Sequence, residues 1–274
     1  MAANLTGYAQ KKVLITGGSS GIGLAMARLL AASGASLVLV ARNQANLQAA
    51  LETLEALRVS PSQTFVIVSV DVADFGQVAH HLHTFTQPAR LPDFIFNAAG
   101  VARPGYAEEI PLDVFKWTMD INYHGTVNVV KHFLDPFIAR GSGAFVNFSS
   151  LAGVIGMFGY TAYAGSKFAV RGFSDALRSE MKPKGIQVTI VYPPDTDTPQ
   201  LEFDNAHKPA ITKEITKGGG LLSASQVADT ILNGIRKEKF TIIPGFEGKI
   251  LKAFSPIVSK ILHSSAVSKV KKGK

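Results

Sequence analysis

The chain of 274 residues contains no cysteine. Disulfides, thiolate catalysis and cysteine-ligated metals are therefore excluded, and a reducing compartment is allowed. Long apolar runs are also missing, because no stretch reaches the roughly 18 uninterrupted apolar residues of a membrane-spanning helix. The opening residues, Met1-Ala-Ala-Asn-Leu, have neither the charged start nor the apolar run of a secretory signal. We therefore expect a cytoplasmic protein.

Histidine is sparse, and the residues that cluster, His80, His81 and His83, fall in a stretch with a helical pattern. No carboxylate pattern accompanies them, so a solvated helix face explains them better than metal ligation. We expect no bound metal. Aromatic stacking residues and a folded basic face, which are typical of nucleic-acid binding, are not evident. We therefore expect no nucleic-acid partner.

Acidic residues are absent from the C-terminal end, where seven lysines occur from Lys249 onward. The formal charge of +8 therefore lies almost entirely there. Apolar residues recur between these lysines at helical spacing, interrupted by Pro256: Ile250, Leu251, Phe254, Ile257, Val258, Ile261 and Leu262. Residues 246–274 thus form a basic amphipathic segment that could lie on an anionic membrane, peripheral on its cytoplasmic face (the endoplasmic reticulum in a eukaryote). Alternatively, this segment could dock on the surface of the rest of the chain or on a second subunit.

Short β-branched apolar runs alternate with helical stretches along residues 12–243. The predicted strands are 12–16, 36–41, 64–70, 93–97, 144–149, 186–192 and 240–243. The predicted helices are 21–33, 44–57, one from about residue 74, a long one through 117–138, 160–181 and 225–236. Seven such strands indicate an α/β fold: a Rossmann-type doubly wound parallel sheet with helices on both faces. Residues 1–245 show no internal linker or repeat, so we expect one domain followed by the segment 246–274.

The first predicted strand runs directly into a glycine-rich sequence at 16–23, and a helix follows. Its glycines permit a tight turn, a close approach to a pyrophosphate and close packing of the helix on the sheet. The helix N-terminus offers free amides and the positive end of a dipole to phosphates. A plain turn is the alternative, but the strand–loop–helix context predicts a dinucleotide site. The predicted contacts are Gly17, Ser19, Ser20, Gly21, Ile22 and Gly23.

The second strand ends in Ala41-Arg42-Asn43, where many dinucleotide folds place an acid that holds the ribose hydroxyls. A guanidinium at Arg42 instead favours an extra 2′-phosphate, so the predicted cofactor is NADPH. An exposed arginine that opens a helix is the alternative. Asp71, next to Val72 after the third strand, could accept a hydrogen bond from the adenine amine, or it could cap the helix that follows.

Tyr163 and Lys167 stand four residues apart, which on a helix places both side chains on one face. The ammonium would bias the phenol toward phenolate, so that Tyr163 could exchange a proton near neutral pH. Ser150, at the exit of the fifth strand, could donate a hydrogen bond to a substrate carbonyl. Together with the glycine loop, these residues predict hydride-transfer chemistry.

The motifs as a set resemble the short-chain dehydrogenase/reductase family over about residues 10–245. The matching residues are Thr-Gly-x-x-x-Gly-Ile-Gly at 16–23, Asn-Ala-Ala-Gly at 97–100, Asn122, Ser149-Ser150 and Tyr163-x-x-x-Lys167. The resemblance implies a catalytic tetrad of Asn122, Ser150, Tyr163 and Lys167. Tyr163 would deliver the proton to the carbonyl oxygen, and Lys167 would stabilise the phenolate and hold the nicotinamide ribose. Asn122 would orient a water that connects Lys167 to solvent.

The Asn-Ala-Ala-Gly loop ends the fourth strand at the side where such sheets bind ligands. The small residues Asn97, Ala98 and Gly100 would let the backbone pack close to the cofactor. A plain strand-to-loop turn is the alternative.

The sequence departs from the family pattern after the sixth strand, where Pro194 replaces a glycine in Tyr192-Pro-Pro-Asp-Thr-Asp-Thr-Pro. Proline removes an amide donor and stiffens the loop. Pro193, Thr196 and Thr198 remain candidate contacts of the cofactor. This run, together with Leu-Val-Ala-Arg at 39–42, is similar to the 3-ketodihydrosphingosine (3-dehydrosphinganine) reductases.

This narrower resemblance implies NADPH-dependent reduction of a long-chain lipid ketone, 3-ketodihydrosphingosine, to sphinganine in sphingolipid synthesis. One alternative keeps the mechanism and changes the substrate to a 3-oxoacyl thioester or a steroid. Another is a non-catalytic NADP-binding scaffold, against which the intact tetrad argues. The long helices between strands could pair two subunits, so we expect a homo-oligomer.

Two further segments are candidates for the substrate surface. Residues 151–159 are apolar and glycine-rich, which suits one wall of a pocket for an alkyl chain or ordinary core packing. Residues 201–222 are polar and without clear periodicity, which predicts a mobile lid. The acids Glu202 and Asp204 in that lid are candidates to meet a substrate amine.

Overall fold

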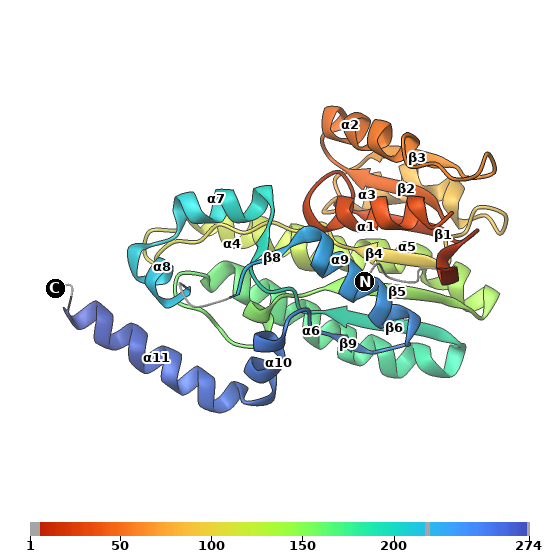
Figure 1. The fold of residues 1–274 in the computed structure, drawn as a ribbon. Helices are drawn as coiled ribbons and strands as arrows, with labels where there is room; N and C mark the ends of the chain where they lie inside the picture. Colours follow the sequence, from red (N-terminus) through yellow and green to blue (C-terminus); the bar gives the residue numbers. More distant parts are fainter. Residues whose placement is uncertain (1–5, 217–219, 273–274) are drawn as a thin grey trace.

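Seven strands form one parallel sheet in the computed structural model, which describes residues 6–216 and 220–272 (Figure 1). The strand order is β3-β2-β1-β4-β5-β6-β9, and every neighbouring pair is parallel. The strands are β1 (Lys12–Thr16), β2 (Ser36–Ala41), β3 (Phe65–Ser69), β4 (Phe94–Asn97), β5 (Gly143–Phe148), β6 (Ile186–Val191) and β9 (Thr241–Ile242). The predicted Rossmann-type sheet is confirmed, and each strand begins and ends within one residue of its predicted range.

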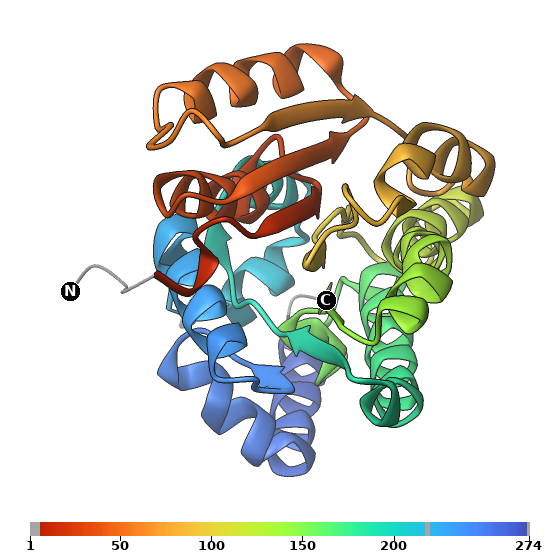
Figure 2. The ribbon, with the colours of Figure 1, turned by 90° about the vertical axis from the view of Figure 1, so that its right-hand side faces the viewer.

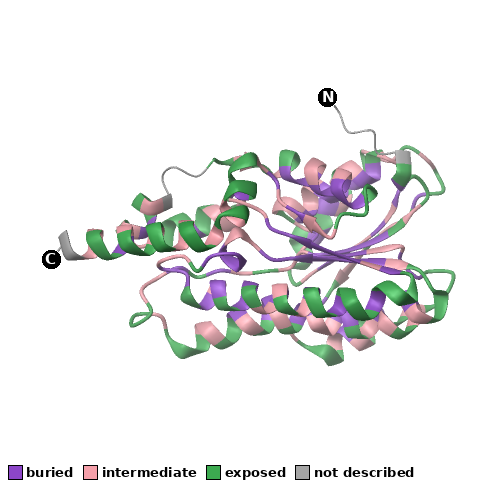
Figure 3. Cartoon of the chain, turned by 90° about the horizontal axis from the view of Figure 1, so that it is seen from below, coloured by how far each residue is buried: buried purple, intermediate pink, exposed green. Residues whose placement is uncertain are grey.

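Helices cover both faces of this sheet because successive residues of a strand face opposite sides. In β1, Val13 and Ile15 belong to the apolar cluster with α1, α2 and α9, whereas Leu14 belongs to the cluster with α3, α5 and α6 (Figure 2). These helices are α1 (Gly21–Ala32), α2 (Gln44–Glu55), α9 (Ala224–Arg236), α3 (Phe75–Leu82), α5 (Gly125–Arg140) and α6 (Thr161–Met181). Figure 3 shows the buried sheet between the two layers.

The long helix predicted through 117–138 is interrupted. α4 (Leu112–Met119) and α5 are joined by a π-helical turn, Asp120–His124, which contains Asn122. A π turn adds a residue to the helical register and is frequent at functional sites. The predicted long helix is therefore present, with a π turn at the position of a candidate catalytic residue.

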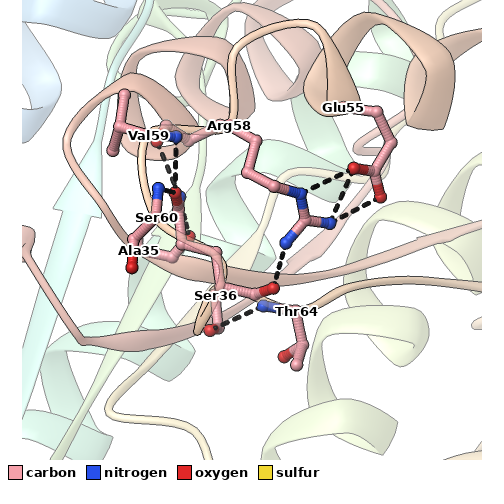
Figure 4. A network of polar contacts seen from close by, with 9 residues as sticks. Ala35, Ser36, Glu55, Arg58, Val59, Ser60 and Thr64 are labelled. Carbon is pink, nitrogen blue, oxygen red and sulfur yellow. Dashed lines mark hydrogen bonds and ion pairs between the residues drawn. The ribbon is translucent and has the colours of Figure 1, made fainter.

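A polar network fixes the connection from α2 to β3, at the amino-terminal edge of the sheet (Figure 4). The buried amide of Gln63 donates to Ala31 O at 2.8 Å and to Ala35 O at 3.0 Å. Its oxygen accepts from Val59 N at 2.8 Å and Ser60 N at 2.9 Å. With all four hydrogen-bonding positions satisfied, burial of this polar side chain costs little.

Residues 201–222 contain two short helices, which the sequence-based prediction of a lid without periodicity missed. They are α7 (Pro199–His207) and α8 (Ala210–Thr216), and the two-residue strands β7 (Thr196–Asp197) and β8 (Leu222–Ser223) pair in parallel beside them. α7 and α8 lie beyond the end of the sheet, on the side of the loop that leaves β6 (Figure 1). Residues 217–219, also within the predicted lid, lie outside the described residues.

The first half of the apolar stretch 151–159 is core. Ala152, Val154 and Ile155 are buried, and the last two pack against Ile190 and Tyr192. In the second half, Met157 and Phe158 are half-buried and line a small pocket with residues of α8 and α11. Core packing therefore accounts for the first half of this stretch, and a wall of an alkyl-chain pocket stays a prediction for the second half.

The C-terminal segment forms two helices, α10 (Phe246–Ala253) and α11 (Ser255–Lys272). One set of its apolar residues packs on the domain core: Leu251, Val258 and Leu262. Another set is exposed: Ile250, Phe254, Ile257 and Ile261. Docking on the chain's own surface therefore accounts for one face of the segment only (Figure 3). Across residues 6–216 and 220–272, no helix is both long and apolar enough to cross a bilayer.

Gly23 and Gly165 give a matched test of packing around the glycine loop. A methyl group on Gly23 would lie 2.2 Å from Gly17 O, whereas one on Gly165, in α6, would meet nothing within 4 Å. We expect Gly23→Ala to destabilise the fold by about 1–3 kcal/mol through overpacking. Gly165→Ala should stabilise it by about 0.5–1 kcal/mol, because alanine loses less backbone entropy in a helix. Denaturant unfolding of both variants measures this, and equal stability would contradict the packing described.

Candidate active site

The glycine loop and the loop after β4 meet where the strand order reverses, between β1 and β4. Gly17 and Gly21 have positive φ values of 67° and 51°. A methyl group on Gly17 would lie 2.9 Å from Ala98 O and from the backbone of Ala99. The Thr16 hydroxyl accepts a hydrogen bond from Ala99 N at 3.1 Å and so joins the loops. Doubly wound sheets bind nucleotides at the crevice of such a reversal.

The glycine loop fits the diphosphate of a dinucleotide. The N-cap of α1, Ser20, makes no side-chain cap hydrogen bond, and the first amides of a helix have no intrahelical acceptor. A methyl group on Gly21 would lie 3.2 Å from Thr198 Cγ2, so the loop faces the start of α7 across a narrow space. Ser19 is half-buried beside Ser20. The side chain of Ile22 packs on the apolar core, so only the backbone of Ile22 is available to a ligand.

Arg42 and Asp71 come together at the ends of β2 and β3. Arg42 Nη1 lies 3.9 Å from Asp71 Oδ2, and the arginine side chain is half-exposed. Asp71 Oδ1 accepts from Ala73 N at 3.0 Å, while the cap of α3 is Asp74. The alternative that Asp71 caps this helix is therefore wrong. Val72 is buried, and its carbonyl accepts from Asn128 Nδ2 at 2.9 Å.

The loop after β4 begins with a buried side chain that has an open acceptor. Asn97 Nδ2 donates to Asn147 Oδ1 at 2.9 Å, but Asn97 Oδ1 has no hydrogen-bond partner among residues 6–216 and 220–272. Such an orphan is uncommon in a protein interior and indicates a site for a further donor. Ala98 and Gly100 complete the loop, and a methyl group on Gly100 would lie 3.2 Å from Asn122 Oδ1 and 3.3 Å from Lys167 Nζ.

Ser150, Tyr163 and Lys167 converge at the ends of β5 and the start of α6. The Ser150 hydroxyl lies near enough to the phenol of Tyr163 to lower its pKa, and it accepts a hydrogen bond from Ala152 N at 3.2 Å. Lys167 is buried; its Nζ donates to Phe148 O at 2.9 Å and lies 5.6 Å from the centre of the Tyr163 ring. The predicted grouping of these three residues is therefore present in the structure.

Burial keeps the phenol of Tyr163 protonated. It raises the pKa of Tyr163 above its usual range, the nearby Ser150 hydroxyl lowers that pKa, and the charges of Asp204 and Asp195 raise it. Burial also lowers the pKa of Lys167 to about 8. Burial is the largest effect on the pKa of Tyr163, and the Lys167 ammonium bonds to Phe148 O. The bias of the phenol toward phenolate by this ammonium stays a prediction. A protonated phenol is what a proton donor requires.

Asn122 is fully buried in the π turn. Its Oδ1 accepts from Val101 N at 2.8 Å, and its Nδ2 donates to Val101 O and to Ser166 Oγ, each at 2.9 Å. The side chain therefore ties α5 to the loop after β4 and to α6. Orientation of a water by Asn122 stays a prediction.

The proline-rich loop lies against the serine of this group. Pro193 O accepts from Leu151 N at 3.2 Å. The Thr196 hydroxyl donates to Pro194 O at 2.8 Å, and the Thr198 hydroxyl donates to Thr196 O at 3.1 Å and caps α7. The predicted contacts of Pro193, Thr196 and Thr198 with a cofactor stay predictions.

Sequence reasoning missed three residues around this group. Ser166 accepts from Asn122 and donates to Tyr163 O at 2.7 Å; its position beside Lys167 was the available signal. Tyr160 stacks near Tyr163, and Lys208 is buried, but no sequence pattern distinguishes either. In the described part of the chain, no cluster of His, Cys, Asp or Glu side chains has the composition of a metal site.

Comparison with known proteins agrees with this geometry. A family model described as short chain dehydrogenase matches residues 11–209. The zebrafish (Danio rerio) 3-dehydrosphinganine reductase is 39% identical over 252 residues, 90% of this chain and 76% of the relative. The mouse (Mus musculus) 3-ketodihydrosphingosine reductase is 37% identical over 244 residues, 89% of this chain and 74% of the relative.

A solved short-chain dehydrogenase from Sphingobium yanoikuyae in complex with NADPH has the same fold. It superposes with a TM-score of 0.78 at 24% identity, covering 92% of this chain and 95% of that one. The fold, the grouped Ser150, Tyr163 and Lys167 and the family match agree. This chain therefore belongs to the short chain dehydrogenase family and is an oxidoreductase.

Proposed function

We propose that this protein reduces 3-ketodihydrosphingosine to sphinganine with NADPH, in sphingolipid synthesis. The observation that carries the proposal is the grouping of Ser150 and Lys167 around a protonated Tyr163. The names of the zebrafish and mouse relatives, which align with about nine-tenths of this chain, support the choice of substrate. The order of the tetrad along the chain argues against a scaffold that only binds NADP.

The protein's own residues handle the proton and the developing charge. Bound NADPH would supply a hydride to the carbonyl carbon. Tyr163 donates its phenolic proton to the carbonyl oxygen, which becomes the hydroxyl of the product. Ser150 donates a hydrogen bond to that oxygen and stabilises the charge that develops on it. Lys167 stabilises the phenolate that remains, which then takes up a proton from solvent.

Arg42 favours NADPH over NADH. The fold accepts either cofactor, and the residue at the end of the second strand commonly distinguishes them. Here that residue is a half-exposed guanidinium 3.9 Å from Asp71, and no acid stands at the end of β2 itself. A guanidinium can donate two N–H groups to a 2′-phosphate in charge-assisted hydrogen bonds. The 2′-hydroxyl of NADH carries no charge, so its hydrogen bond with arginine is weaker.

The exposed face of α10 and α11 provides a surface for membrane contact. Exposed apolar residues on these helices lie near Lys249 and Lys260 in the sequence, whereas Lys252 turns toward Thr241 and Tyr192 of the domain. α11 also lines the small pocket formed with Met157 and Phe158. A lipid ketone would enter from an anionic membrane beside this segment. We place the protein in the cytoplasm, peripheral on such a membrane.

The homo-oligomer stays a prediction. Exposed apolar residues on α4 and α6, Leu112, Trp117 and Phe168, offer a surface on which a second copy could pack.

Tyr163→Phe tests the assigned proton donor. It removes the hydroxyl and keeps the ring, so we expect turnover to fall about 100- to 10,000-fold with NADPH binding retained. Tyr123→Phe, a half-buried tyrosine in the π turn, should behave like the unaltered protein. NADPH oxidation is followed with a panel that contains 3-ketodihydrosphingosine, a 3-oxoacyl thioester and a steroid ketone. Equal activity of Tyr163→Phe would refute the mechanism, and preference for another ketone would refute the substrate.

Arg42→Ala tests the cofactor preference. Loss of charge-assisted hydrogen bonds should raise KM for NADPH roughly 10- to 100-fold and leave KM for NADH nearly unchanged. Arg28→Ala, an exposed arginine of α1, is the control and should change neither value. Similar changes with both cofactors, or none, would rule out the proposed contact with the 2′-phosphate.

Ile257→Glu with Ile261→Glu tests the membrane surface without disturbing the packed face of the segment. The unaltered protein should co-sediment with phosphatidylserine-containing vesicles, less strongly as salt rises. The double variant should bind about tenfold more weakly for each isoleucine removed. Val59→Glu, which changes an exposed residue distant in sequence from α10 and α11, is the control. Failure of the unaltered protein to bind such vesicles at low salt would reject membrane association.

A further inference from the structure

α7 carries a buried carboxylate next to the catalytic helix. Asp204 is 8% exposed. Its Oδ1 accepts from Gln200 Nε2 at 2.7 Å, and its Oδ2 accepts from the Tyr160 hydroxyl at 3.4 Å. An aspartate is rarely buried without a cation, because the charged form loses its hydration. Both of these donors are neutral, and the longer hydrogen bond is weak.

Asp204 lies close to the proton donor. The rings of Tyr160 and Tyr163 have their centres 5.8 Å apart, so the carboxylate stands one aromatic ring away from the catalytic phenol. Its negative charge raises the pKa of Tyr163, and the charge of Asp195 acts in the same direction. Both acids therefore act against negative charge that develops at the phenol.

The ammonium of Lys208 pairs with the other acid of this region. Lys208, which is 6% exposed, has its Nζ 3.5 Å from Asp195 Oδ2, and it also lowers the pKa of Asp204. Burial outweighs this effect and raises the pKa of Asp204 to about 6. Within the part of the chain that the structure describes, Asp204 itself makes no ion pair.

A carboxylate without an ion pair so near Tyr163 opposes the reduction of a neutral ketone. Negative charge develops on the carbonyl oxygen next to Tyr163 in the transition state, and a nearby carboxylate destabilises it. A cation on the substrate would remove this penalty and would give the buried carboxylate its missing partner. The protonated amine of an amino ketone, on the carbon next to the carbonyl, is such a cation.

We infer that Asp204 is a specificity-determining residue that binds the protonated amine of the substrate and so selects amino ketones over neutral ketones. The inference rests on the proposed reductase function and names the group of the substrate that this site recognises. The structure also distinguishes the two acids of the predicted lid, because Glu202 on the same helix is exposed and Asp204 is buried.

A purely structural role is the competing account. Asp204 could serve only to hold α7 against α6 through Tyr160 and Gln200. Substitution would then lower activity toward every ketone by the same factor. Binding of an ammonium instead requires that the effect depend on the charge of the substrate, which separates the two roles.

The test compares three ketones of equal chain length with NADPH: 3-ketodihydrosphingosine, its N-acetyl derivative and the 3-ketone without an amine. We expect kcat/KM of the unaltered protein to be on the order of 100-fold higher for the amino ketone, the size expected for loss of one partner of a buried charge pair. Asp204→Asn keeps the side-chain shape and should lose a similar factor with the amino ketone and little with the amine-free ketone. Glu202→Gln is the matched control and should change neither value.

Each outcome decides the inference. Equal kcat/KM of the unaltered protein for the charged and uncharged ketones would overturn it and leave the reductase function intact. Equal losses in Asp204→Asn for both ketones would also overturn it, in favour of the structural role. Turnover of none of the three ketones would overturn the proposed function and, with it, this inference. If Asp204→Asn does not fold, the comparison of ketones in the unaltered protein decides alone.

Discussion

The approach of two loops at the reversal of the sheet constrains every part of the site. The backbone after β1 passes so close to Ala98 and Ala99, after β4, that Gly17 has no room for a side chain. This contact sets the N-terminus of α1 beside the loop after β4. The same loop reaches Asn122 and Lys167 at Gly100, so the nucleotide cradle and the proton-transfer residues share one backbone segment. Their relative position therefore follows from packing of the sheet and does not depend on a flexible connection.

Burial decides the electrostatics of the catalytic group. Lys167 is surrounded by protein, and a hydrogen bond to the Phe148 carbonyl holds its ammonium near Tyr163, while burial lowers the pKa of Lys167 to about 8. The phenol experiences a similar loss of hydration and stays protonated. Such burial is unfavourable for folding, since a charged amine loses water for few hydrogen bonds. Functional sites commonly retain arrangements of this kind at the expense of stability.

The sequence predicts the sheet well because its strands are buried on both faces and appear as short apolar runs bounded by glycine and polar residues. Gly17, Tyr163 and Lys167 are equally accessible to prediction, since their spacing has a direct structural meaning. The helices α7 and α8 were missed because few apolar residues mark a buried face in 201–222. The pKa of Tyr163 and the burial of Asp204 depend on neighbours distant in sequence, which no local pattern contains. The split of the C-terminal segment into a packed and an exposed face likewise depends on which residues of the domain lie beside it.

In the proposed reaction, Tyr163 and its neighbours protonate a lipid ketone while the cofactor transfers hydride to it. The most direct measurement follows the transferred atom itself. NADPH carrying deuterium at the transferable position of its nicotinamide is incubated with the protein and 3-ketodihydrosphingosine, and the product is examined by mass spectrometry. The account predicts sphinganine with one deuterium on the carbon that bears the new hydroxyl group. Sphinganine without the label at that carbon, or no sphinganine at all, would contradict it.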